Sequence, residues 1–227
     1  MPQTMPIIAT PGIEPAVRAV IEREHEAAFA QVRERRASAP RERDALPTMD
    51  FRTSERHRTG YLAIGPNQGR FLFALALSRK ARTIVEFGSS FGISTLYLAA
   101  AAKAAGGRVI GSEYHPHKAG KARANLSDAG LSEIAEIRVG DARETLLDAP
   151  AGIDLLFLDG AKDLYLPILE RLEPKLAANA LVVADNADHL DDDDPFLAHI
   201  GTGRYVTSRI AFAKGAMTLS VWMGEAS

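Results

Sequence analysis

Polar residues that directly follow two apolar runs could together hold a metal ion. Asp159 and Lys162 follow one run, and Asp185 and Asn186 follow the next. Carboxylate and amide oxygens are hard ligands suited to Mg²⁺ or Ca²⁺, and three protein ligands leave about three positions of an octahedral ion for water or substrate. A half-open site of this kind favours chemistry over a purely structural role. Either aspartate alone could merely cap the segment after it, but together, with Lys162 close by, they favour a site.

Lys162 is the candidate general base of this site. Most lysines that follow a strand are solvated. Beside a divalent cation and partly buried, however, an ammonium is destabilised and its pKa falls, so that the neutral amine could accept a proton.

These residues must be positioned by the elements around them, and the chain from Gly65 onward alternates between strand and helix patterns. The expected strands cover 83–87, 108–112, 136–139, 153–158 and 181–184, and the expected helices cover 68–77, 93–105, 116–129, 142–147 and 164–172. Two further β-rich runs, 204–212 and 217–223, meet at Lys214-Gly215 and predict a hairpin.

Strands that alternate with helices predict a parallel sheet covered on both faces, which explains why the strands are apolar throughout. The expected fold class is α/β: a Rossmann-like, doubly wound, mostly parallel seven-stranded sheet with a C-terminal antiparallel hairpin and helices on both faces. Such open sheets bind ligands beyond the carboxyl ends of their strands. Because neighbouring strands lie about 5 Å apart, polar residues at the strand ends can converge.

The turn after the first strand is rich in glycine and reads Glu86-Phe-Gly88-Ser-Ser-Phe-Gly92. Glycines here let the backbone approach a ligand closely, although they are as often structural. A dinucleotide-binding fingerprint would need glycine at positions 90 and 93, where this chain has Ser90 and Ile93. A nicotinamide-dependent dehydrogenase is therefore poorly supported.

Two more acids stand at the ends of the second and third strands. Glu113 could accept hydrogen bonds from both hydroxyls of an adenosine ribose, or it could be a solvated loop acid. Asp141, in Gly140-Asp141-Ala142, could accept a bond from an adenine amino group. It could also cap the next helix, and both roles are compatible.

The N-terminal part of the chain has a different sequence pattern from the region after Gly65. Apolar residues recur at helical spacing over 14–36, with Pro15 where a first helical turn tolerates proline. The charge-dense run from Arg33 to Asp44 is expected to be an exposed connector. We therefore expect an N-terminal helical segment over 1–59 and the α/β domain over 60–227.

Composition narrows the possible partners. The net charge is −2 and there is no cysteine. With no basic excess, neither nucleic acid nor an anionic membrane is an expected partner, and no apolar run approaches the roughly 18–20 residues that span a bilayer. The absence of cysteine excludes disulfides and thiolate sites and fits a reducing compartment. The start of the chain has no signal-peptide pattern, so a cytoplasmic protein is expected.

Five motifs, taken in order, resemble those of a known family. They are Glu86-Phe-Gly88-x-x-x-Gly92, Glu113, Gly140-Asp141-Ala142, Asp159-x-x-Lys162-x-x-Tyr165 and Asp185-Asn186. Together they are similar to the cation-dependent class I O-methyltransferases, which include catechol O-methyltransferase, caffeoyl-CoA O-methyltransferase and many bacterial relatives. The resemblance runs from about Gly60 to the C-terminus, and Gly65-Pro66-Asn67-Gln68-Gly69 resembles the family's entry into its first core helix.

The resemblance implies S-adenosylmethionine as cofactor and a divalent cation, Mg²⁺ or another such as Mn²⁺ or Ca²⁺. It implies cofactor contacts from Glu86, Gly88, Ser94, Glu113, Asp141, Ala142 and Asp159, metal ligands in Asp159, Asp185 and Asn186, and Lys162 as the catalytic base. In the implied mechanism the ion coordinates both oxygens of a vicinal diol, Lys162 removes a proton, and the oxyanion attacks the sulfonium methyl in line. The acceptor would be a small hydroxylated, catechol-like molecule. Segments such as 1–59 cover the acceptor pocket or pack in a dimer in this family, so a homodimer is expected.

The chain departs from the family after Asp185-Asn186. Where relatives often have leucine, an aromatic residue and glycines, this chain has Ala187-Asp188-His189-Leu190 and then four aspartates. Acidic runs are usually solvated loops, which is the interpretation we favour over a second ion contact or a selectivity element. His189 could polarise a substrate, but a lone loop histidine seldom does.

Two alternatives stay open at this point. One keeps S-adenosylmethionine and drops the catalytic metal. The other is a non-catalytic S-adenosylmethionine-binding module, in which the acidic loop and the N-terminal helix serve a partner protein. The presence of Lys162 argues against the second alternative, because binding alone has no need of a base.

Overall fold

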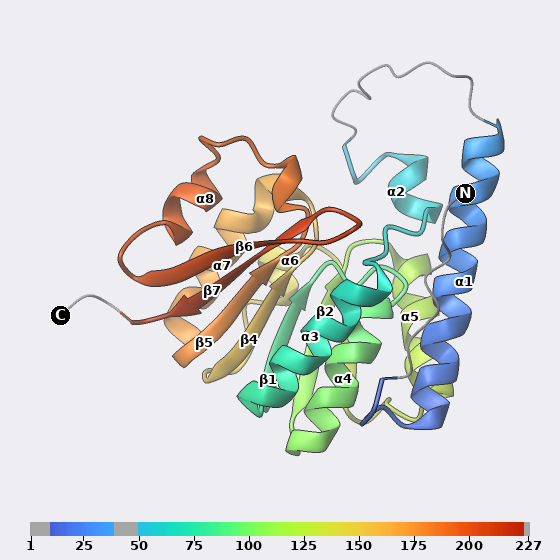
Figure 1. The fold of residues 1–227 in the computed structure, drawn as a ribbon, viewed down its shortest axis with the longest axis horizontal. Helices are drawn as coiled ribbons and strands as arrows, with labels where there is room; N and C mark the ends of the chain where they lie inside the picture. Colours follow the sequence, from blue (N-terminus) through green and yellow to red (C-terminus); the bar gives the residue numbers. More distant parts are fainter. Residues whose placement is uncertain (1–9, 39–49, 225–227) are drawn as a thin grey trace.

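The central sheet has seven strands in the order β3-β2-β1-β4-β5-β7-β6 (Figure 1). The computed structural model describes residues 10–38 and 50–224. The strands are β1 (Thr83–Phe87), β2 (Arg108–Glu113), β3 (Ala135–Val139), β4 (Ile153–Leu158), β5 (Leu176–Ala184), β6 (Tyr205–Ala211) and β7 (Ala216–Trp222). Strands β1 to β5 are parallel, and β7 pairs antiparallel with both β5 and β6. The predicted fold class is confirmed.

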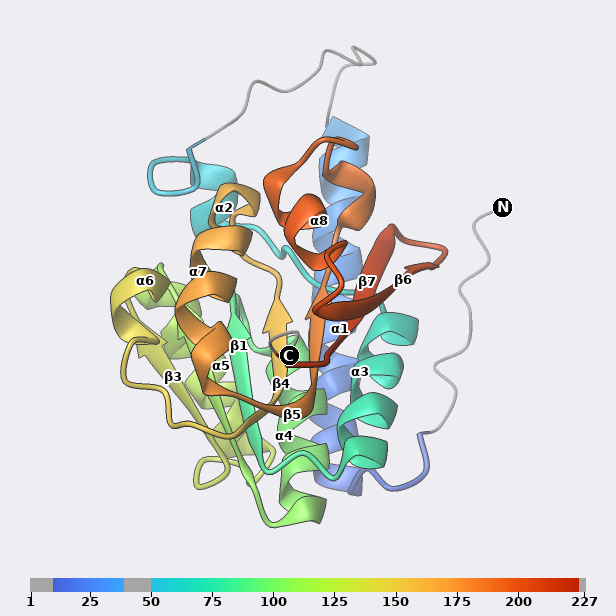
Figure 2. The ribbon, with the colours of Figure 1, turned by 90° about the vertical axis from the view of Figure 1, so that its left-hand side faces the viewer.

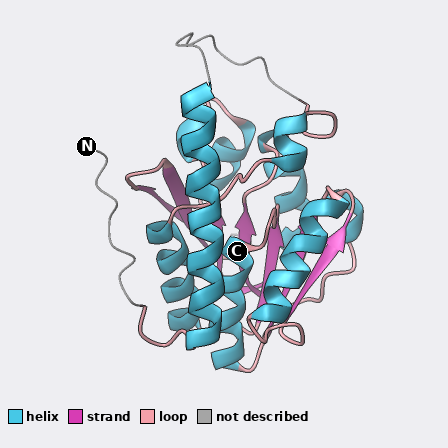
Figure 3. Ribbon diagram, turned by 90° about the vertical axis from the view of Figure 1, so that its right-hand side faces the viewer, coloured by secondary structure: helices cyan, strands magenta, loops and turns pink. Residues whose placement is uncertain are grey.

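Helices cover both faces of this sheet. They are α1 (Pro15–Ser38), α2 (Glu55–Thr59), α3 (Pro66–Arg79), α4 (Ile93–Ala105), α5 (Pro116–Asp128), α6 (Ala142–Thr145), α7 (Tyr165–Leu172) and α8 (Pro195–Ile200). Helices α3, α4 and α5 share one apolar core with the sheet, and α1 packs outside them against α4 and α5. Helices α6, α7 and α8 share the core of the other face. Figure 2 views the molecule from the side of α7, and Figure 3 from the side of α1.

The two cores follow from the alternation of side chains along each strand. In β4, Leu155 and Phe157 point into the core under α4, whereas Leu156 and Leu158 point into the core under α7. All four side chains are fully buried, and each such burial contributes about 1.5–3 kcal/mol. A buried parallel strand therefore needs apolar residues at every position, which is why its end is easy to see in the sequence.

The register of the central strands brings their carboxyl ends level. Phe87 of β1 pairs with Leu158 of β4, and Leu158 pairs with Ala184 of β5. The next residues continue the ladder, because Asp159 N donates to Phe87 O at 2.8 Å and Asp185 N donates to Leu158 O at 2.9 Å. The residues that follow the three strands are thus neighbours.

Several predicted boundaries need correction. Helix α1 continues to Ser38, so the first part of the predicted connector is helical; its remaining residues, from 39 onward, lie outside the described residues. Strand β5 begins at Leu176 rather than 181, and its early pairing with β4 is irregular. Glu113 is the last residue of β2 instead of following it. Helices α2 and α8 were not expected from the sequence pattern.

Among the helices in the described parts of the chain, none combines the length and apolar character needed to cross a bilayer.

Candidate active site

Asp159, Asp185 and Asn186 meet at the carboxyl ends of β4 and β5. Asn186 Nδ2 donates one hydrogen bond to Asp159 Oδ1 and another to Asp185 Oδ2, each at 3.1 Å. Asn186 adopts a left-handed backbone conformation with φ of 56°, which asparagine tolerates better than most residues. The structure therefore brings the three predicted metal ligands to one point.

Gln68, in the first turn of α3, completes the support of Asp185. Its Nε2 donates to Asp185 Oδ1 at 2.6 Å, and its Oε1 accepts from Gly65 N at 2.7 Å. The side chain is buried, so the first bond orients one carboxylate oxygen while Asn186 holds the other. Sequence reasoning did not assign Gln68 a role, although it lies in the motif around Gly65 that carried part of the resemblance.

Lys162 lies beside the two carboxylates on a short 3-10 turn before α7. Its Nζ is 3.9 Å from Asp159 Oδ1 and donates hydrogen bonds to Gly160 O at 3.1 Å and to the hydroxyl of Tyr165 at 2.6 Å. The side chain keeps 30% exposure, so its ammonium can be reached from outside. The predicted base and the predicted ligands are therefore side by side.

Burial sets the electrostatics of this group. It raises the pKa of Asp159 well above its ordinary value, and the negative charge of Asp185 raises it further, while Lys162 acts in the opposite sense. Burial also raises the pKa of Asp185. Conversely, burial lowers the pKa of Lys162, which the two aspartates oppose. Two buried carboxylates that repel each other form a site that a cation would stabilise.

The donor set fits a hard divalent cation, with one condition. Within the residues that the structure describes, no three His, Cys, Asp or Glu side chains form a group able to hold a metal ion. An ion here would therefore depend on Asn186 as the third ligand. In the structure the amide nitrogen of Asn186 faces the carboxylates, so its amide must turn over to present its oxygen. Two carboxylates and an amide oxygen are ligands typical of Mg²⁺ and Ca²⁺.

The glycine-rich turn lies directly against Asp159. Gly88 has φ of 94°, and a Cβ there would lie 2.7 Å from the backbone of Asp159 and Gly160. No other residue fits this close approach. Glu86, two residues earlier, is fully buried and accepts hydrogen bonds from the hydroxyls of Ser89, at 2.6 Å, and Thr95. Burial raises the pKa of Glu86, and its Oε1 has no partner among the described residues.

The remaining predicted cofactor residues continue along the same edge of the sheet. Glu113 is bound by two backbone amides, Ser90 N at 2.8 Å and His115 N at 2.7 Å. These bonds tie the end of β2 to the glycine-rich turn. Asp141 caps α6 by accepting from Arg143 N at 2.9 Å, and the Arg143 guanidinium pairs with it at 2.6 Å and holds its pKa below the ordinary value. Ala142, next to it, is buried.

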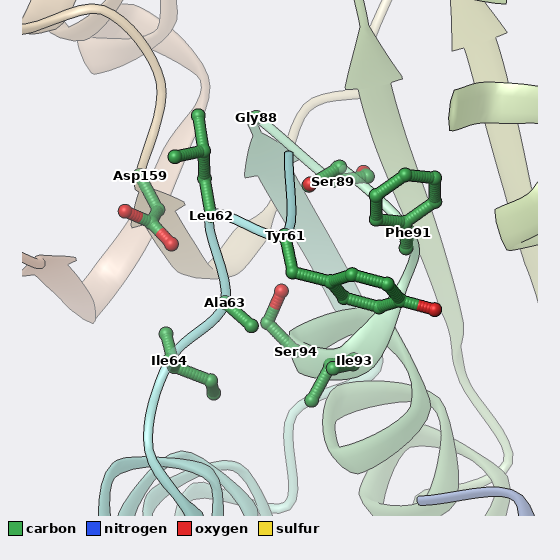
Figure 4. A pocket seen from close by; sticks show the side chains of 11 residues that line it. Tyr61, Leu62, Ala63, Ile64, Gly88, Ser89, Phe91, Ile93, Ser94 and Asp159 are labelled. Carbon is green, nitrogen blue, oxygen red and sulfur yellow. The ribbon is translucent and has the colours of Figure 1, made fainter. Parts of the chain in front are cut away.

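A narrow cavity of about 10 Å³ opens between the glycine-rich turn and the segment before α3 (Figure 4). It is lined by Tyr61, Leu62, Ala63, Ile64, Gly88, Ser89, Ser90, Phe91, Ile93, Ser94 and Asp159. Of the residues predicted to bind the cofactor, Gly88, Ser94 and Asp159 are among these, whereas Glu86, Glu113, Asp141 and Ala142 are not. The wall formed by residues 61–64 has no motif in the sequence, and we did not predict it.

The acidic stretch beyond Asn186 is only partly a solvated loop. Asp191, Asp192 and Asp193 are exposed, as predicted. Asp194, however, caps α8 by accepting from Phe196 N at 2.8 Å, and Asp188 Oδ1 accepts from Ala216 N at 2.8 Å at the β6–β7 turn. His189 is 65% exposed. Both ends of the stretch thus have structural partners.

Comparison with known proteins adds to this geometry. Residues 85–187 match the model of a methyltransferase domain. A catechol O-methyltransferase of Mycobacterium tuberculosis is 36% identical over 126 residues, which is 55% of this chain and 57% of that protein. The chain thus spans a little over half the length of the curated relatives that it matches.

Two solved structures extend the likeness. The O-methyltransferase TomG from Streptomyces achromogenes, in complex with SAM, is 29% identical with a TM-score of 0.64, covering 72% of this chain and 82% of its own. The cofactor-bound protein Rv0187 from MTB is 26% identical with a TM-score of 0.66, covering 92% of this chain and 90% of its own. The matched regions include the sheet edge where the candidate residues gather.

Proposed function

Because the chain belongs to the class I O-methyltransferase family, which includes the catechol O-methyltransferases, we propose that it transfers a methyl group from S-adenosylmethionine to a hydroxyl of a small catechol-like molecule. The observation that carries this proposal is the register of β1, β4 and β5. This register supports the proposal because Gly88 lies against the backbone of Asp159, Asn186 joins Asp159 to Asp185, and the amine of Lys162 is 3.9 Å from Asp159 Oδ1.

The cofactor would extend along the carboxyl edge of the sheet. Gly88, Ser94 and Asp159 line the cavity and are assigned to the methionine half. Glu113 and Asp141 follow at the ends of the next two strands and are assigned to the ribose and the adenine. The complex of TomG with SAM supports this cofactor. Glu86, which supports the glycine-rich turn through the bond from Ser89, is assigned to the methionine half as well.

Asp159, Asp185 and Asn186 would hold a divalent cation, most simply Mg²⁺. Such an ion, when bound, lowers the pKa of a hydroxyl that contacts it. Lys162 Nζ would accept the proton of the acceptor hydroxyl, since burial lowers the pKa of this lysine and favours the neutral amine. The protein's further contribution is to orient the acceptor oxygen toward the sulfonium methyl at near-attack distance.

The decisive experiment measures methyl transfer to a panel of catechols, hydroxycinnamates and flavonoids. The protein is incubated with S-adenosylmethionine and each compound, with Mg²⁺ in one series and with excess chelator in the other, and products are identified by mass spectrometry. We expect at least one vicinal diol to gain a single methyl group in the Mg²⁺ series alone. Equal turnover with chelator would instead establish a methyltransferase without a catalytic metal.

A non-catalytic binding module makes a different prediction. Isothermal titration would then show tight binding of S-adenosylmethionine, while no diol in the panel is methylated with Mg²⁺, Mn²⁺ or Ca²⁺. That result would overturn the proposed reaction and leave the cofactor assignment intact.

A further inference from the structure

Residues 61–64 form one wall of the cavity, and Tyr61 connects this wall to the N-terminal helix. We propose that Tyr61 is a positioning residue for cofactor binding, held in place by Glu24 and Gln31 of α1. The inference rests on the proposed function, because it takes the cavity to be the site of S-adenosylmethionine. It gives the N-terminal helix a defined task in that site.

Helix α1 holds Tyr61 at two atoms. The Tyr61 hydroxyl donates to Glu24 Oε2 at 2.8 Å, and Tyr61 N donates to Gln31 Oε1 at 2.7 Å. Gln31 Nε2 also donates to the backbone oxygen of Thr59 at 3.3 Å. Side chain and backbone of Tyr61 are therefore both fixed by a helix that does not itself line the cavity.

Glu24 is a firm anchor. Its side chain is only 2% exposed, yet it is paired with Arg23 and Lys121, each at 3.0 Å. These two cations and the Tyr61 hydroxyl lower the pKa of Glu24, although burial acts in the opposite sense. A buried carboxylate with three such partners has little freedom to move.

Phe91, the neighbour of Tyr61 in the cavity lining, is held by the same turn of α1. The ring of Tyr61 packs against that of Phe91, with 4.4 Å between centroids, and both residues line the cavity. Phe91 O accepts from Asn125 Nδ2 at 2.9 Å, and Asn125 Oδ1 accepts from Arg23 at 2.7 Å. Arg23 and Glu24, neighbours in α1 that pair with each other, thus support Phe91 through Asn125 and Tyr61 directly.

The two sides of this cavity lie close together. Its volume is only about 10 Å³, against about 300 Å³ or more for most small-molecule sites, so the two sides must separate when the cofactor binds. The side formed by residues 61–64 then contacts the cofactor closely, and the position of Tyr61 affects how long the cofactor stays bound. A wall released from α1 should bind the cofactor more weakly, because the wall must be ordered again on binding.

The test compares Tyr61→Phe with the wild-type full chain. This change removes the bond to Glu24 and keeps the ring against Phe91. We expect the Kd for S-adenosylmethionine, measured by isothermal titration, to rise about tenfold and its dissociation rate to rise in step, with kcat at saturating cofactor nearly unchanged. Glu24→Met, which has no oxygen to accept from the Tyr61 hydroxyl, should give a similar increase, and the double variant should add little to either single change because both remove the same contact.

Two further variants complete the design. Gln31→Ala releases the backbone of Tyr61 by another route and should also weaken cofactor binding, which covers the case in which Tyr61→Phe does not fold. Glu14→Gln, which breaks an exposed ion pair between the residue just before α1 and Lys103, is the control and should leave the Kd unchanged.

The outcomes separate this inference from the proposed function. If the wild type binds S-adenosylmethionine and both Tyr61→Phe and Gln31→Ala bind it within twofold of wild type, Tyr61 is not a positioning residue. If the variants lose thermal stability but keep the wild-type Kd, the contacts are merely structural and the inference fails as well. A folded wild type that does not bind the cofactor overturns the proposed function together with this inference.

Discussion

The ammonium of Lys162 donates a hydrogen bond to the phenolic oxygen of Tyr165 at 2.6 Å, and that hydroxyl donates in turn to the backbone oxygen of Asp185 at 3.2 Å. Tyr165 is fully buried, so it gives the lysine a fixed partner. The amine is thereby held 3.9 Å from Asp159 Oδ1. This arrangement makes Lys162 a stronger candidate for the general base than its position in the sequence alone does.

Replacing Lys162 tests that role. We expect Lys162→Ala to lower kcat by about 10²-fold or more, because the acceptor proton loses its base, while the Kd for S-adenosylmethionine stays near the wild-type value. Steady-state methylation and isothermal titration measure the two quantities. Lys103→Ala, at the far end of α4, is the matched control. A Lys162→Ala enzyme with normal turnover would remove the base from the mechanism.

The pH dependence of turnover follows from the same lysine. Its neutral form accepts the proton, and burial lowers its pKa from the ordinary 10.5. Activity should therefore rise with increasing pH and level off below pH 10.5. If kcat instead falls steadily as the pH increases toward 10.5, the assignment of Lys162 as the base is wrong.

Asp185→Asn tests the ion site. The change removes one of the two carboxylates but keeps an oxygen that can accept from Gln68. Added Mg²⁺ should raise the Tm of the wild type, because an ion that binds only the folded state stabilises it. The variant should lose both this rise and the methyl-transfer activity. Thermal unfolding with and without Mg²⁺ is the measurement, and Asp191→Asn, in the exposed acidic stretch, should respond like the wild type. An equal rise in Asp185→Asn would exclude Asp185 as a ligand.

Because His25 is buried, we expect the protein to lose stability in mild acid. The side chain is completely buried against Tyr97, and burial lowers its pKa from 6.5 to about 4. Below pH 6.5 the unfolded chain therefore binds a proton that the folded protein resists until about pH 4. Stability present above pH 6.5 is lost as the pH falls through this window, by about 3 kcal/mol in total.

Urea unfolding at pH 7 and pH 4.5 measures this effect. Exposed carboxylates titrate alike in the wild type and in His25→Gln, so the difference between the two proteins isolates the histidine. We expect His25→Gln to lose clearly less stability over this interval, and equal losses would refute the prediction.

We expect the protein to become more stable when Lys118 is replaced by methionine. Its side chain is 2% exposed, and its Nζ lies 5.3 Å from the centroid of the Phe91 ring. Burial lowers its pKa, and the charges of Glu113 and Asp159 oppose this effect. Lys118→Met keeps most of the volume and removes a buried charge whose desolvation outweighs that attraction, so we expect the free energy of unfolding to increase by about 1 kcal/mol. Chemical denaturation checks it, and a decrease would show that the ammonium is stabilising.

Which features could be predicted from the sequence depends on how far apart the interacting residues lie. Strand β4 is apolar at nearly every position, so its end, and with it Asp159, is visible without a structure. Parallel strands end at the same edge, so the meeting of Asp159 with Asp185 followed from the topology alone. The hydrogen bond from Gln68 to Asp185 joins residues 117 positions apart, and no local sequence pattern predicts it.

The same reasoning explains the missed cavity wall. Tyr61 contacts Glu24, 37 residues earlier, and neither side chain belongs to a motif. The prediction that the acidic run is wholly solvated was wrong for Asp194, because an aspartate before Pro195 is also the start signal of a helix. Helix α8 has only six residues, too few for its apolar spacing to be recognised.

The place of β7 has a consequence for how the chain is made. Strand β6 is joined to the sheet only through β7, which follows it in the sequence. During synthesis β6 therefore emerges from the ribosome before its partner strand, and β5 keeps an open edge until β7 has emerged as well. An open edge is a template for unwanted pairing, so a nascent chain that stalls between β6 and β7 should be the species most in need of a chaperone.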